Sequence, residues 1–469
     1  MNNTFLVTSH TDHIDSNSTF IVQDGFKDSG LKYLSLAIKK GAKKIVIPNK
    51  YKIEAQKIIA ENLAENLAEN LNIKYVEDCR LELSKLSAEA YDFPSLKLKI
   101  IGVTGTKGKT SSTFLLYHML KKLGYKVGLI SGVHCQLGDE IIKSNLTTPQ
   151  ADFINWFLDK AVKNNYTHIV MEVSAQAITL KRVAHINFYG GLFTNFSSEH
   201  LEFYNNLDEY FQAKAQLINL IDKDGFFIIN GDEDHYFKLN LKLREKVKTF
   251  SILNGDYKYN IENSNPVIIK FNNFTFKTNL IGSFNAINLA GILSILISMN
   301  IDISKTTNLL DDFKGVPGRM ESYKLKNNSI AIIDYAHNPS SYASFFPTVR
   351  TLTKNLIAIF GCGGERDSAR RPIMGEIASK YADQIILTTD NPRSEDAQKI
   401  AEEILSGIPI KEHHKVIIIL DRAAAIKKAY EISSGESLIA LLGKGPDEYQ
   451  EIGQNKFFFS DFKELANYF

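Results

Sequence analysis

Short, mostly apolar runs alternate along this chain with longer segments in which apolar residues recur at helical spacing. A run such as His168–Val173 is typical of a strand buried on both faces of a parallel sheet. Parallel strands need a crossover, usually helical, so the alternation predicts an α/β fold. Further strands are expected at residues 98–103, 191–195 and 226–231, and in the last third at residues 329–334, 356–360, 384–388, 415–420 and 437–442.

One strand-to-helix junction carries a glycine loop. The run Gly105-Thr106-Lys107-Gly108-Lys109-Thr110-Ser111 follows the strand at 98–103 and precedes a helical pattern at 113–120. Glycines let the backbone approach phosphates, the helix N-terminus presents N–H donors, and Lys109 adds a positive charge. Position 103 is valine rather than the glycine of the longer motif, so the match is to a shorter form. The loop predicts binding of a nucleoside triphosphate; the alternative is a plain glycine turn.

The chain of 469 residues is too long for one ordinary core, and about 150 residues per domain suggests about three domains. Two breaks divide it: Pro94-Ser95 is typical of a linker, and Gly315-Val-Pro-Gly318 of a hinge. The expected domains are a short α/β domain at 1–96, a central α/β domain resembling P-loop ATPases at 97–316, and a Rossmann-like, doubly wound domain at 317–469.

Composition excludes several classes of protein. A net charge of +2 does not indicate binding to nucleic acid. The first residues lack a basic stretch followed by a long apolar one, and no apolar run approaches about 20 residues, so neither a signal peptide nor a membrane span is expected. Cys79, Cys135 and Cys362 lie too far apart for a disulfide framework or a CxxC metal site, which suits a reducing cytoplasm.

Three residues of the central segment are candidates for a metal–nucleotide site. Glu172 ends a predicted strand, where its carboxylate could hold Mg²⁺ beside Thr110, although a strand-end Glu is more often a cap or an ion-pair partner. His200 follows the strand at 191–195, and a lone histidine is usually structural. Lys214 lies on a helical pattern and by composition alone is a solvated surface lysine.

Polar motifs follow the predicted strand ends of the last third, where a doubly wound sheet binds its ligands. In Asp390-Asn-Pro-Arg393 a proline-stiffened turn presents an amide and a guanidinium, which binds carboxylates bidentately; the alternative is turn chemistry alone. Arg319, beside the hinge, could reach a phosphate or form an ion pair. The other motifs are Asp334-Tyr-Ala-His337, Gly361-Cys-Gly-Gly-Glu-Arg366 and Gly443-Lys-Gly445.

Taken in order, these motifs resemble those of the Mur ligases. The resemblance covers nearly the whole chain and is strongest from residue 100 to residue 450. So many ordered matches are far more specific than any single one. Besides the stretches above, it rests on Thr147-Thr-Pro149, Glu172-Val-Ser174, Thr194-Asn-Phe-Ser-Ser-Glu-His200, Ala213-Lys214, Gly282-Ser-Phe-Asn285, Asn288-Leu and Gly318-Arg-Met-Glu321.

Within that family the motifs are most similar to those of members that add the third amino acid. The resemblance implies that ATP phosphorylates the γ-carboxylate of UDP-MurNAc-L-Ala-D-Glu, releasing ADP, and that the amine of the added amino acid attacks the acyl phosphate through a tetrahedral intermediate. A carboxylate is inert until phosphate makes a leaving group, and the charged intermediates need Mg²⁺ and fixed cations. It also implies peptidoglycan precursor synthesis in the cytoplasm by a monomer, without nucleic-acid or membrane partners.

The resemblance assigns roles by position. Lys109 and the amides of the loop would hold the phosphates, while Thr110, Glu172, His200 and a carbamylated Lys214 would serve the magnesium sites. The remaining assignments are, for ATP, Asn288, Arg319, Asp334 and His337; for the UDP-MurNAc-dipeptide, Ser16, Thr147, Thr148, Ser174 and Arg182; and for the added amino acid, Arg366, Asp390, Asn391, Arg393, Gly443 and Asp447.

The identity of the added amino acid is a finer question. In the family, Asp-Asn-Pro-Arg accompanies meso-diaminopimelate, whose distal carboxylate the arginine can bind, and lysine-adding relatives lack this arginine. The family's Gly-Lys-Gly-His-Glu is here Gly443-Lys-Gly-Pro446-Asp447, which shortens the carboxylate expected to meet the distal ammonium. Asp447 could serve if the loop shifts, or Glu448 could substitute. The motifs favour meso-diaminopimelate and leave lysine or ornithine as alternatives.

Three other interpretations differ further. Folylpolyglutamate synthase, a related ligase, lacks a uridine domain and would not explain residues 390–393. A non-catalytic nucleotide-binding regulator predicts the loss of Lys214 or Glu172, and both are present. A P-loop kinase or a plain ATPase leaves the C-terminal motifs unexplained.

Overall fold

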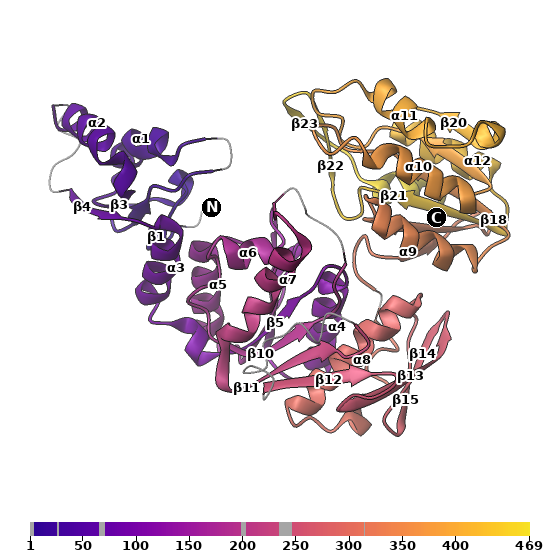
Figure 1. The fold of residues 1–469 in the computed structure, drawn as a ribbon, viewed down its shortest axis with the longest axis horizontal. Helices are drawn as coiled ribbons and strands as arrows, with labels where there is room; N and C mark the ends of the chain where they lie inside the picture. The colour runs from indigo at the N-terminus through magenta and orange to yellow at the C-terminus, as the bar shows by residue number, and fades with distance from the viewer. Residues whose placement is uncertain (1–3, 26–27, 65–70, 198–202, 234–245, 314) are drawn as a thin grey trace. The chain divides into compact units, whose positions relative to one another are not determined.

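The computed structural model describes residues 4–25, 28–64, 71–197, 203–233, 246–313 and 315–469. The chain divides into two compact units (Figure 1). One comprises residues 1–262, 269–277 and 286–311, and the other comprises residues 263–268, 278–285 and 312–469. The predicted first and central domains thus share the first unit, and the predicted C-terminal domain makes up most of the second. The domain boundaries at residues 96 and 316 stay predictions.

A four-stranded parallel sheet, in chain order, forms the start of the first unit. Because side chains alternate along a strand, the sheet buries both faces. Phe20 packs with helices α1 (Leu34–Lys39) and α2 (Lys52–Ala64), whereas Ile21 packs with α3 (Cys79–Ala90). The strands are β1 (Val7–Thr8), β2 (Thr19–Ile21), β3 (Lys44–Pro48) and β4 (Asn72–Val76).

The prediction of a linker at Pro94 and Ser95 is wrong. These residues begin a short 3₁₀ helix, Pro94–Lys97, and both are buried. Ser95 Oγ accepts a hydrogen bond from the backbone N–H of Asn187, 92 residues further along, at 3.2 Å. A buried N–H needs an acceptor, and because Ser95 supplies it, the connection is fixed in place.

The larger sheet has eleven strands in the order β15-β14-β13-β12-β11-β10-β5-β9-β6-β7-β8. Strand β5 (Lys99–Thr104) runs parallel to both of its neighbours, so the carboxyl ends of all three strands lie at one edge. The other strands are β6 (Val127–Ile130), β7 (His134–Leu137), β8 (Glu140–Lys143), β9 (His168–Glu172), β10 (Phe188–Phe193), β11 (Ile221–Asn230), β12 (Val247–Ser251), β13 (Tyr257–Ser264), β14 (Val267–Phe271) and β15 (Phe274–Lys277). The helices are α4 (Lys109–Lys122), α5 (Ala151–Lys163), α6 (Ala175–Thr179), α7 (Leu207–Ala215) and α8 (Ser283–Ser298).

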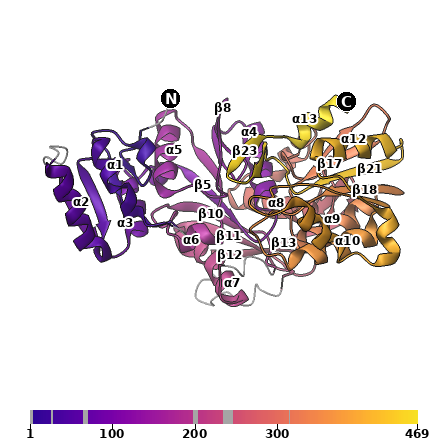
Figure 2. The same ribbon diagram turned by 90° about the horizontal axis from the view of Figure 1, so that it is seen from above.

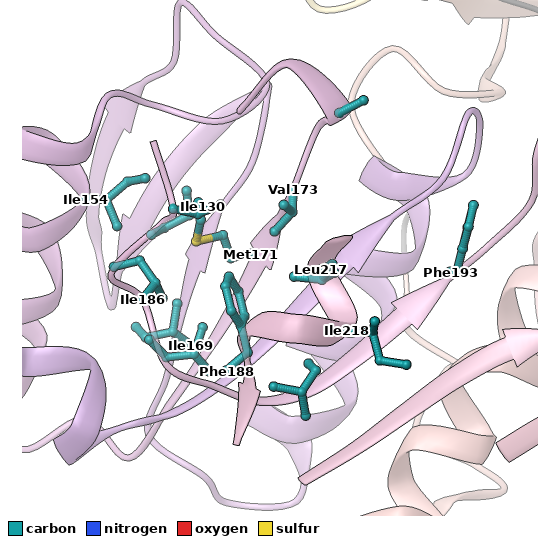
Figure 3. Close-up of a cluster of buried hydrophobic side chains, with 14 of the residues drawn as sticks. Ile130, Ile154, Ile169, Met171, Val173, Ile186, Phe188, Phe193, Leu217 and Ile218 are labelled. Atoms are coloured by element: carbon teal, nitrogen blue, oxygen red, sulfur yellow. The ribbon is translucent and has the colours of Figure 1, made fainter. Parts of the chain in front are cut away.

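A large apolar cluster anchors β9 and its neighbours. Ile130 of β6 and Met171 of β9 pack in one cluster with Ile154 of α5, and all three are fully buried (Figure 3). Burial of such side chains contributes roughly 1.5–3 kcal/mol each. The end of β9, where Glu172 lies, is therefore held by a rigid core.

The second unit confirms the doubly wound prediction. Its main sheet has six strands in the order β16-β17-β21-β18-β19-β20, and all pairs are parallel except β16 (Glu321–Lys324) with β17 (Ile330–Asp334). Helices α12 (Arg422–Ile432) and α13 (Asp461–Leu465) cover one face, and α9 (Pro339–Arg350) and α10 (Arg370–Tyr381) cover the other (Figure 2). Helix α11 (Ala397–Leu405) packs on the same face as α9 and α10. The remaining strands are β18 (Asn355–Phe360), β19 (Gln384–Leu387), β20 (Val416–Ile418), β21 (Ser437–Leu442) and a hairpin of β22 (Tyr449–Ile452) and β23 (Asn455–Phe458).

The cysteines play a packing role. All three are buried free thiols, and burial raises the pKa of each of Cys79, Cys135 and Cys362 to about 12. A thiol with so high a pKa is a poor nucleophile. Within the described ranges, no helix is both long and apolar enough to cross a membrane.

Candidate active site

The loop between β5 and α4 is folded back on itself by its lysine. Nζ of Lys109 donates hydrogen bonds to the carbonyl oxygens of Gly105 and Thr106, both at 2.9 Å. Gly105 (φ 138°) and Gly108 (φ 78°) adopt backbone conformations that other residues rarely take. Gly108 caps α4, so the N–H groups of the first helical turn open onto the loop. Strand, loop and helix thus form the arrangement that a phosphate site requires.

Two residues after β10, Thr194 and Asn195, hold the loop in place; they belong to a motif of the resemblance, but neither was assigned a role. Thr194 Oγ1 and Asn195 Nδ2 both donate to the carbonyl oxygen of Lys107, at 2.6 and 3.1 Å. Asn195 in turn accepts the N–H of Lys107 at its side chain and that of Thr106 at its backbone, both at 2.9 Å. A Cβ at Gly105 would lie 2.0 Å from Thr194 Oγ1. The available signal was a polar Thr-Asn pair at the end of a strand neighbouring β5.

Asn288 of α8 is brought to the same loop. It is buried, and a Cβ at Gly108 would lie only 2.4 Å from its Oδ1. Glycine is therefore required at the helix start for two reasons, the positive φ and the close approach of this amide. The structure thus places a predicted ATP residue from a distant helix against the phosphate loop.

Glu172 is fully buried at the end of β9 and faces the first turn of α4. Its Oε2 accepts a hydrogen bond from Thr110 Oγ1 at 3.2 Å, and its Oε1 accepts the N–H of Gly132 at 2.9 Å. Hydroxyl and carboxylate oxygens are ligands that Mg²⁺ prefers, so this pair fits the predicted metal role. His200 lies outside the described residues. Within the part of the chain that the structure describes, no three His, Cys, Asp or Glu side chains gather as a metal cluster.

The interpretation of Lys214 as a solvated surface lysine is wrong. The residue is 2% exposed, and its Nζ donates to the carbonyl oxygen of Gly105 at 2.9 Å. The amine also lies 4.2 Å from the ring centre of Tyr210, one helical turn earlier on α7. Helical periodicity alone could not reveal this, because the face of α7 that carries Lys214 packs on the loop only in the folded unit.

Three residues predicted for the UDP-MurNAc-dipeptide lie together: Thr148 and Arg182 are buried, and Ser174 is half-buried. Thr148 Oγ1 donates to the carbonyl oxygen of Glu172 at 2.9 Å and accepts the N–H of Ser174 at 3.0 Å. Arg182 Nη1 donates to the carbonyl oxygen of Thr148 at 2.8 Å. Burial, with a smaller effect of the charge on Arg80, lowers the pKa of Arg182 to about 10. Among the described residues its Nε has no hydrogen-bond partner, so this 6%-exposed guanidinium is suited to receive an anion.

The other two residues predicted for this substrate differ in placement. Thr147 is exposed and packs beside Gly132, where a Cβ would lie 3.2 Å from its Cα, so it borders the Glu172 and Thr148 group. Ser16 is exposed near Gly41 in the small-sheet region. No hydrogen bond between described residues joins Ser16 to the Thr148 group.

In the second unit, Arg319, Asp334 and His337 lie around the end of β17. Asp334 accepts two backbone N–H bonds at 2.8 Å, and burial raises the pKa of its carboxyl. The guanidinium carbon of Arg319 lies 4.6 Å from the ring centre of Tyr335, whose carbonyl oxygen is 2.7 Å from His337 Nδ1. Burial lowers the pKa of His337, which favours the neutral imidazole.

The predicted amino-acid residues Asp390, Asn391 and Gly443 meet at the ends of β19 and β21. Nζ of Lys444, which belongs to the Gly443-Lys-Gly445 motif but received no role from the sequence, lies 3.2 Å from Asn391 Oδ1 and 3.5 Å from Asp390 Oδ1. Lys444 is fully buried, and burial lowers its pKa. A Cβ at Gly443 would lie 2.9 Å from Asp390 Oδ2, so the glycine makes room for this carboxylate.

Arg393 ends the same turn and pairs with a carboxylate that the sequence did not predict. Its Nε donates to Glu451 Oε2 at 3.1 Å, and its Nη1 donates to the carbonyl oxygen of Gly364. A Cβ at Gly363 would lie 3.3 Å from Arg393 Nη1 and 3.8 Å from Arg366 Cγ. The side chains of Arg366 and Arg393 therefore both lie beside Gly363.

Known proteins are similar to this chain. Residues 103–296 match the Mur ligase middle domain, and residues 318–445 match the Mur ligase, glutamate ligase domain. A relative from Cytophaga hutchinsonii, named UDP-N-acetylmuramoyl-L-alanyl-D-glutamate–2,6-diaminopimelate ligase, is 34% identical over 97% of this chain and 93% of its own length. One of the same name from Aquifex aeolicus is 36% identical over 97% of this chain and 91% of its own. The chain belongs to the Mur ligase family and is an ATP-dependent ligase.

A solved structure supports the fold. The structure of a UDP-N-acetylmuramoyl-L-alanyl-D-glutamate–2,6-diaminopimelate ligase aligns with 99% of this chain and 94% of its own, with a TM-score of 0.65 and 24% sequence identity. This likeness shows that the two chains share a fold.

Proposed function

We propose that this ligase adds meso-diaminopimelate to the D-Glu γ-carboxylate of UDP-MurNAc-L-Ala-D-Glu, converting ATP to ADP and phosphate, in the synthesis of peptidoglycan precursors. The observation that carries the choice of amino acid is Arg393, a partly exposed guanidinium on the same turn as Asn391. A guanidinium in that position suits an amino acid with a second carboxylate. The names of the relatives at 34% and 36% identity agree with this choice.

In the first half-reaction the γ-carboxylate attacks the γ-phosphorus of ATP, and the bond to the departing ADP oxygen breaks. The loop amides and Lys109 hold the phosphates. Lys109 now contacts the carbonyl oxygens of Gly105 and Thr106, and it exchanges these neutral acceptors for charged phosphate oxygens. The exchange is favourable because hydrogen bonds between charged partners are stronger.

Thr110 and Glu172 are the residues that would hold Mg²⁺, with His200 as a further ligand. When bound, the ion supplies positive charge that offsets the phosphate oxygens. Lys214 would act as a carbamate: its ammonium loses one proton, and the neutral nitrogen then bonds to the carbon of CO₂ and loses a second. A cation thereby becomes an anionic oxygen ligand. Its buried position beside Gly105 suits a group directed at the phosphate loop.

In the second half-reaction the amine of the added amino acid attacks the acyl carbon. A tetrahedral carbon forms, the nitrogen loses a proton, phosphate leaves, and an amide results. The far end of the amino acid is held so that its other amine reaches the acyl phosphate. The residues proposed to hold it are Arg366, Asp390, Asn391, Arg393, Gly443 and Asp447.

The remaining proposed residues contact either the UDP-MurNAc-dipeptide or ATP. Arg182, buried and without a carboxylate partner among the described residues, would bind an anionic group of the UDP-MurNAc-dipeptide with Thr147, Thr148 and Ser174, and Ser16 would lie at the uridine end. Asn288, Arg319, Asp334 and His337 would contact ATP. The reaction belongs in the cytoplasm, where ATP and nucleotide sugars are made, and we expect a monomer without nucleic-acid or membrane partners.

A competition ligation tests the proposal. The protein is incubated with ATP, Mg²⁺, UDP-MurNAc-L-Ala-D-Glu and equal concentrations of meso-diaminopimelate, lysine and ornithine, and the product is identified by mass. The diaminopimelate adduct is expected to dominate. A dominant lysine or ornithine adduct overturns the choice of amino acid, and no adduct with any of the three overturns the ligation itself.

A further inference from the structure

Strand β22 is attached to the turn that ends in Arg393. The N–H of Glu451 donates to Asn391 Oδ1 at 2.9 Å, and the N–H of Arg393 donates to the carbonyl oxygen of Glu451 at 3.0 Å. The N–H of Gly453 donates to the carbonyl oxygen of Arg393 at 2.7 Å. The last two bonds join backbone to backbone, and all three use only backbone atoms of strand β22 and its turn, so they fix residue 451 beside Arg393 whatever its side chain.

The side chains of Arg393 and Glu451 form an ion pair that uses only part of each group. Nε of Arg393 meets Oε2 of Glu451 at 3.1 Å, and Nη1 is bound to Gly364. Among the residues that the structure describes, Nη2 of Arg393 and Oε1 of Glu451 make no hydrogen bond. The two side chains are 21% and 27% exposed. A cation and an anion therefore lie side by side, each with an unused polar atom and access to solvent.

This arrangement matches the chemistry of an amino-acid end group. The distal carbon of diaminopimelate carries both a carboxylate and an ammonium. A guanidinium alone satisfies the carboxylate and leaves the ammonium without a partner, which costs binding free energy once the site closes around it. A carboxylate next to the guanidinium supplies that partner.

Asp447, the residue expected to meet the ammonium, lies in the same neighbourhood: burial, and then the charges of Asp447 and Glu451, raise the pKa of Tyr449, which the charge of Arg393 lowers. The N–H of Asp447 donates to the carbonyl oxygen of Lys444 at 2.9 Å. Burial, and after it the charge of Asp447, raise the pKa of Tyr335 to about 12, so this carboxylate lies near the segment that carries the Arg319 contact. The carboxylate paired with Arg393 is that of Glu451.

We infer that Glu451 is a specificity-determining residue of the amino-acid site, accepting the distal ammonium of diaminopimelate while Arg393 binds the distal carboxylate. The inference rests on the proposed function and deepens it. It explains how the chain keeps an anion for the ammonium although its Gly-Lys-Gly motif continues with Pro446-Asp447. The rival hypothesis is that Glu451 competes with the substrate: its carboxylate would occupy Arg393 and would have to be displaced by the distal carboxylate of diaminopimelate.

The test compares two substrates in two variants. meso-Diaminopimelate carries both distal groups, whereas 2-aminopimelate keeps the distal carboxylate and lacks the ammonium. Ligation kinetics are measured with each for the wild type and for Glu451→Gln, which keeps the shape and removes the charge. Glu436→Gln, at an exposed carboxylate before β21, is the matched control. Asp447→Asn and Glu448→Gln examine the two neighbouring carboxylates.

The inference predicts that Glu451→Gln lowers kcat/KM for meso-diaminopimelate about 10-fold or more, mainly through KM, because a hydrogen bond to a charged group is lost. For 2-aminopimelate the change is expected to stay within about 3-fold, and the KM values for ATP and UDP-MurNAc-L-Ala-D-Glu should not move. The preference for meso-diaminopimelate then collapses in this variant and persists in Glu436→Gln.

Three results would overturn the inference while leaving the proposed function intact. Glu451→Gln could change kcat/KM equally for both substrates, or it could improve the use of meso-diaminopimelate. The preference for meso-diaminopimelate could also be lost in Asp447→Asn or Glu448→Gln instead of in Glu451→Gln. A wild type that forms no diaminopimelate product overturns the proposed function, and the inference with it.

Discussion

The amine of Lys214 donates a hydrogen bond to the carbonyl oxygen of Gly105 at 2.9 Å, across 109 positions of sequence. The same carbonyl oxygen accepts a hydrogen bond from Lys109, also at 2.9 Å. Two lysines from different helices thus converge on the first glycine of the phosphate loop. Such convergence is expected where several phosphate oxygens and their counter-charges must be placed together.

Replacing Lys214 with alanine should reduce ligation by about 100-fold or more, because an electrostatic group directed at the phosphates is lost. Short-chain carboxylic acids such as acetate or propionate should restore part of the rate by supplying the missing carboxylate. ADP formation and product mass measure both effects. Lys223→Ala, at an exposed lysine of β11, should behave as wild type. Full activity in Lys214→Ala would contradict the carbamate assignment.

Arg393→Ala should raise the KM for meso-diaminopimelate about 10- to 100-fold, since a charged hydrogen-bonding partner of its carboxylate is removed. The KM for UDP-MurNAc-L-Ala-D-Glu should stay within about 2-fold of wild type. Arg393→Lys, which keeps the charge without the planar fork, should fall between the two. An unchanged KM for meso-diaminopimelate in the alanine variant would remove Arg393 from the site.

Thr194→Val should raise the KM for ATP about 5-fold. The substitution removes the hydroxyl that donates to the carbonyl oxygen of Lys107 at 2.6 Å, and one such hydrogen bond contributes about 1 kcal/mol. Thr194→Ser keeps the hydroxyl and is the control. Initial rates measured against ATP concentration give the KM of each variant. Equal KM values for Thr194→Val and Thr194→Ser would mean that the loop does not depend on this hydroxyl.

The first unit should lose stability as the pH falls from about 6.5 to about 4. Burial, and to a lesser extent the charge of Lys99, lower the pKa of His168 from 6.5 to about 4. Between these values the unfolded chain binds a proton that the folded unit does not, so the free energy of unfolding rises with pH across this window. The resulting gain in the free energy of unfolding is complete above pH 6.5 and amounts to about 3 kcal/mol.

Urea unfolding followed by the fluorescence of Trp156 measures this effect, because that single tryptophan lies on α5 in the first unit. His168→Gln should remove most of the pH dependence between pH 4 and 6.5 while other titrating groups are unchanged. A parallel decline in wild type and variant would show that His168 is not the group responsible.

Regular elements of the fold were predictable where local pattern and burial agree. The five parallel strands of the second unit lie within a residue or two of the predicted runs, because their Ile and Leu residues face apolar helices on both sides of the sheet. Strands β13 to β15 were not predicted, since polar residues interrupt their apolar pattern on exposed faces. Pro94 suggested a linker because the local sequence gives no sign that Ser95 accepts a hydrogen bond from the backbone N–H of Asn187.

The candidate site was predictable where a motif is contiguous and not where partners meet across the chain. The phosphate loop and the turn at 390–393 carry their chemistry within a few residues. Lys214 could not be distinguished from a surface lysine, because its burial depends on how α7 packs on the loop. Glu451 carried no local signal, since its position beside Arg393 comes from backbone hydrogen bonds between β22 and a turn 58 residues earlier.

Transfer of oxygen from substrate to phosphate tests the central claim most directly. UDP-MurNAc-L-Ala-D-Glu labelled with ¹⁸O in the γ-carboxylate is incubated with ATP, Mg²⁺ and meso-diaminopimelate, and the tripeptide product and the released phosphate are analysed by mass. Ligation through an acyl phosphate predicts the diaminopimelate adduct together with one ¹⁸O atom in each phosphate. An adduct with unlabelled phosphate would contradict the acyl phosphate, and unlabelled phosphate without any adduct would contradict the ligase account as a whole.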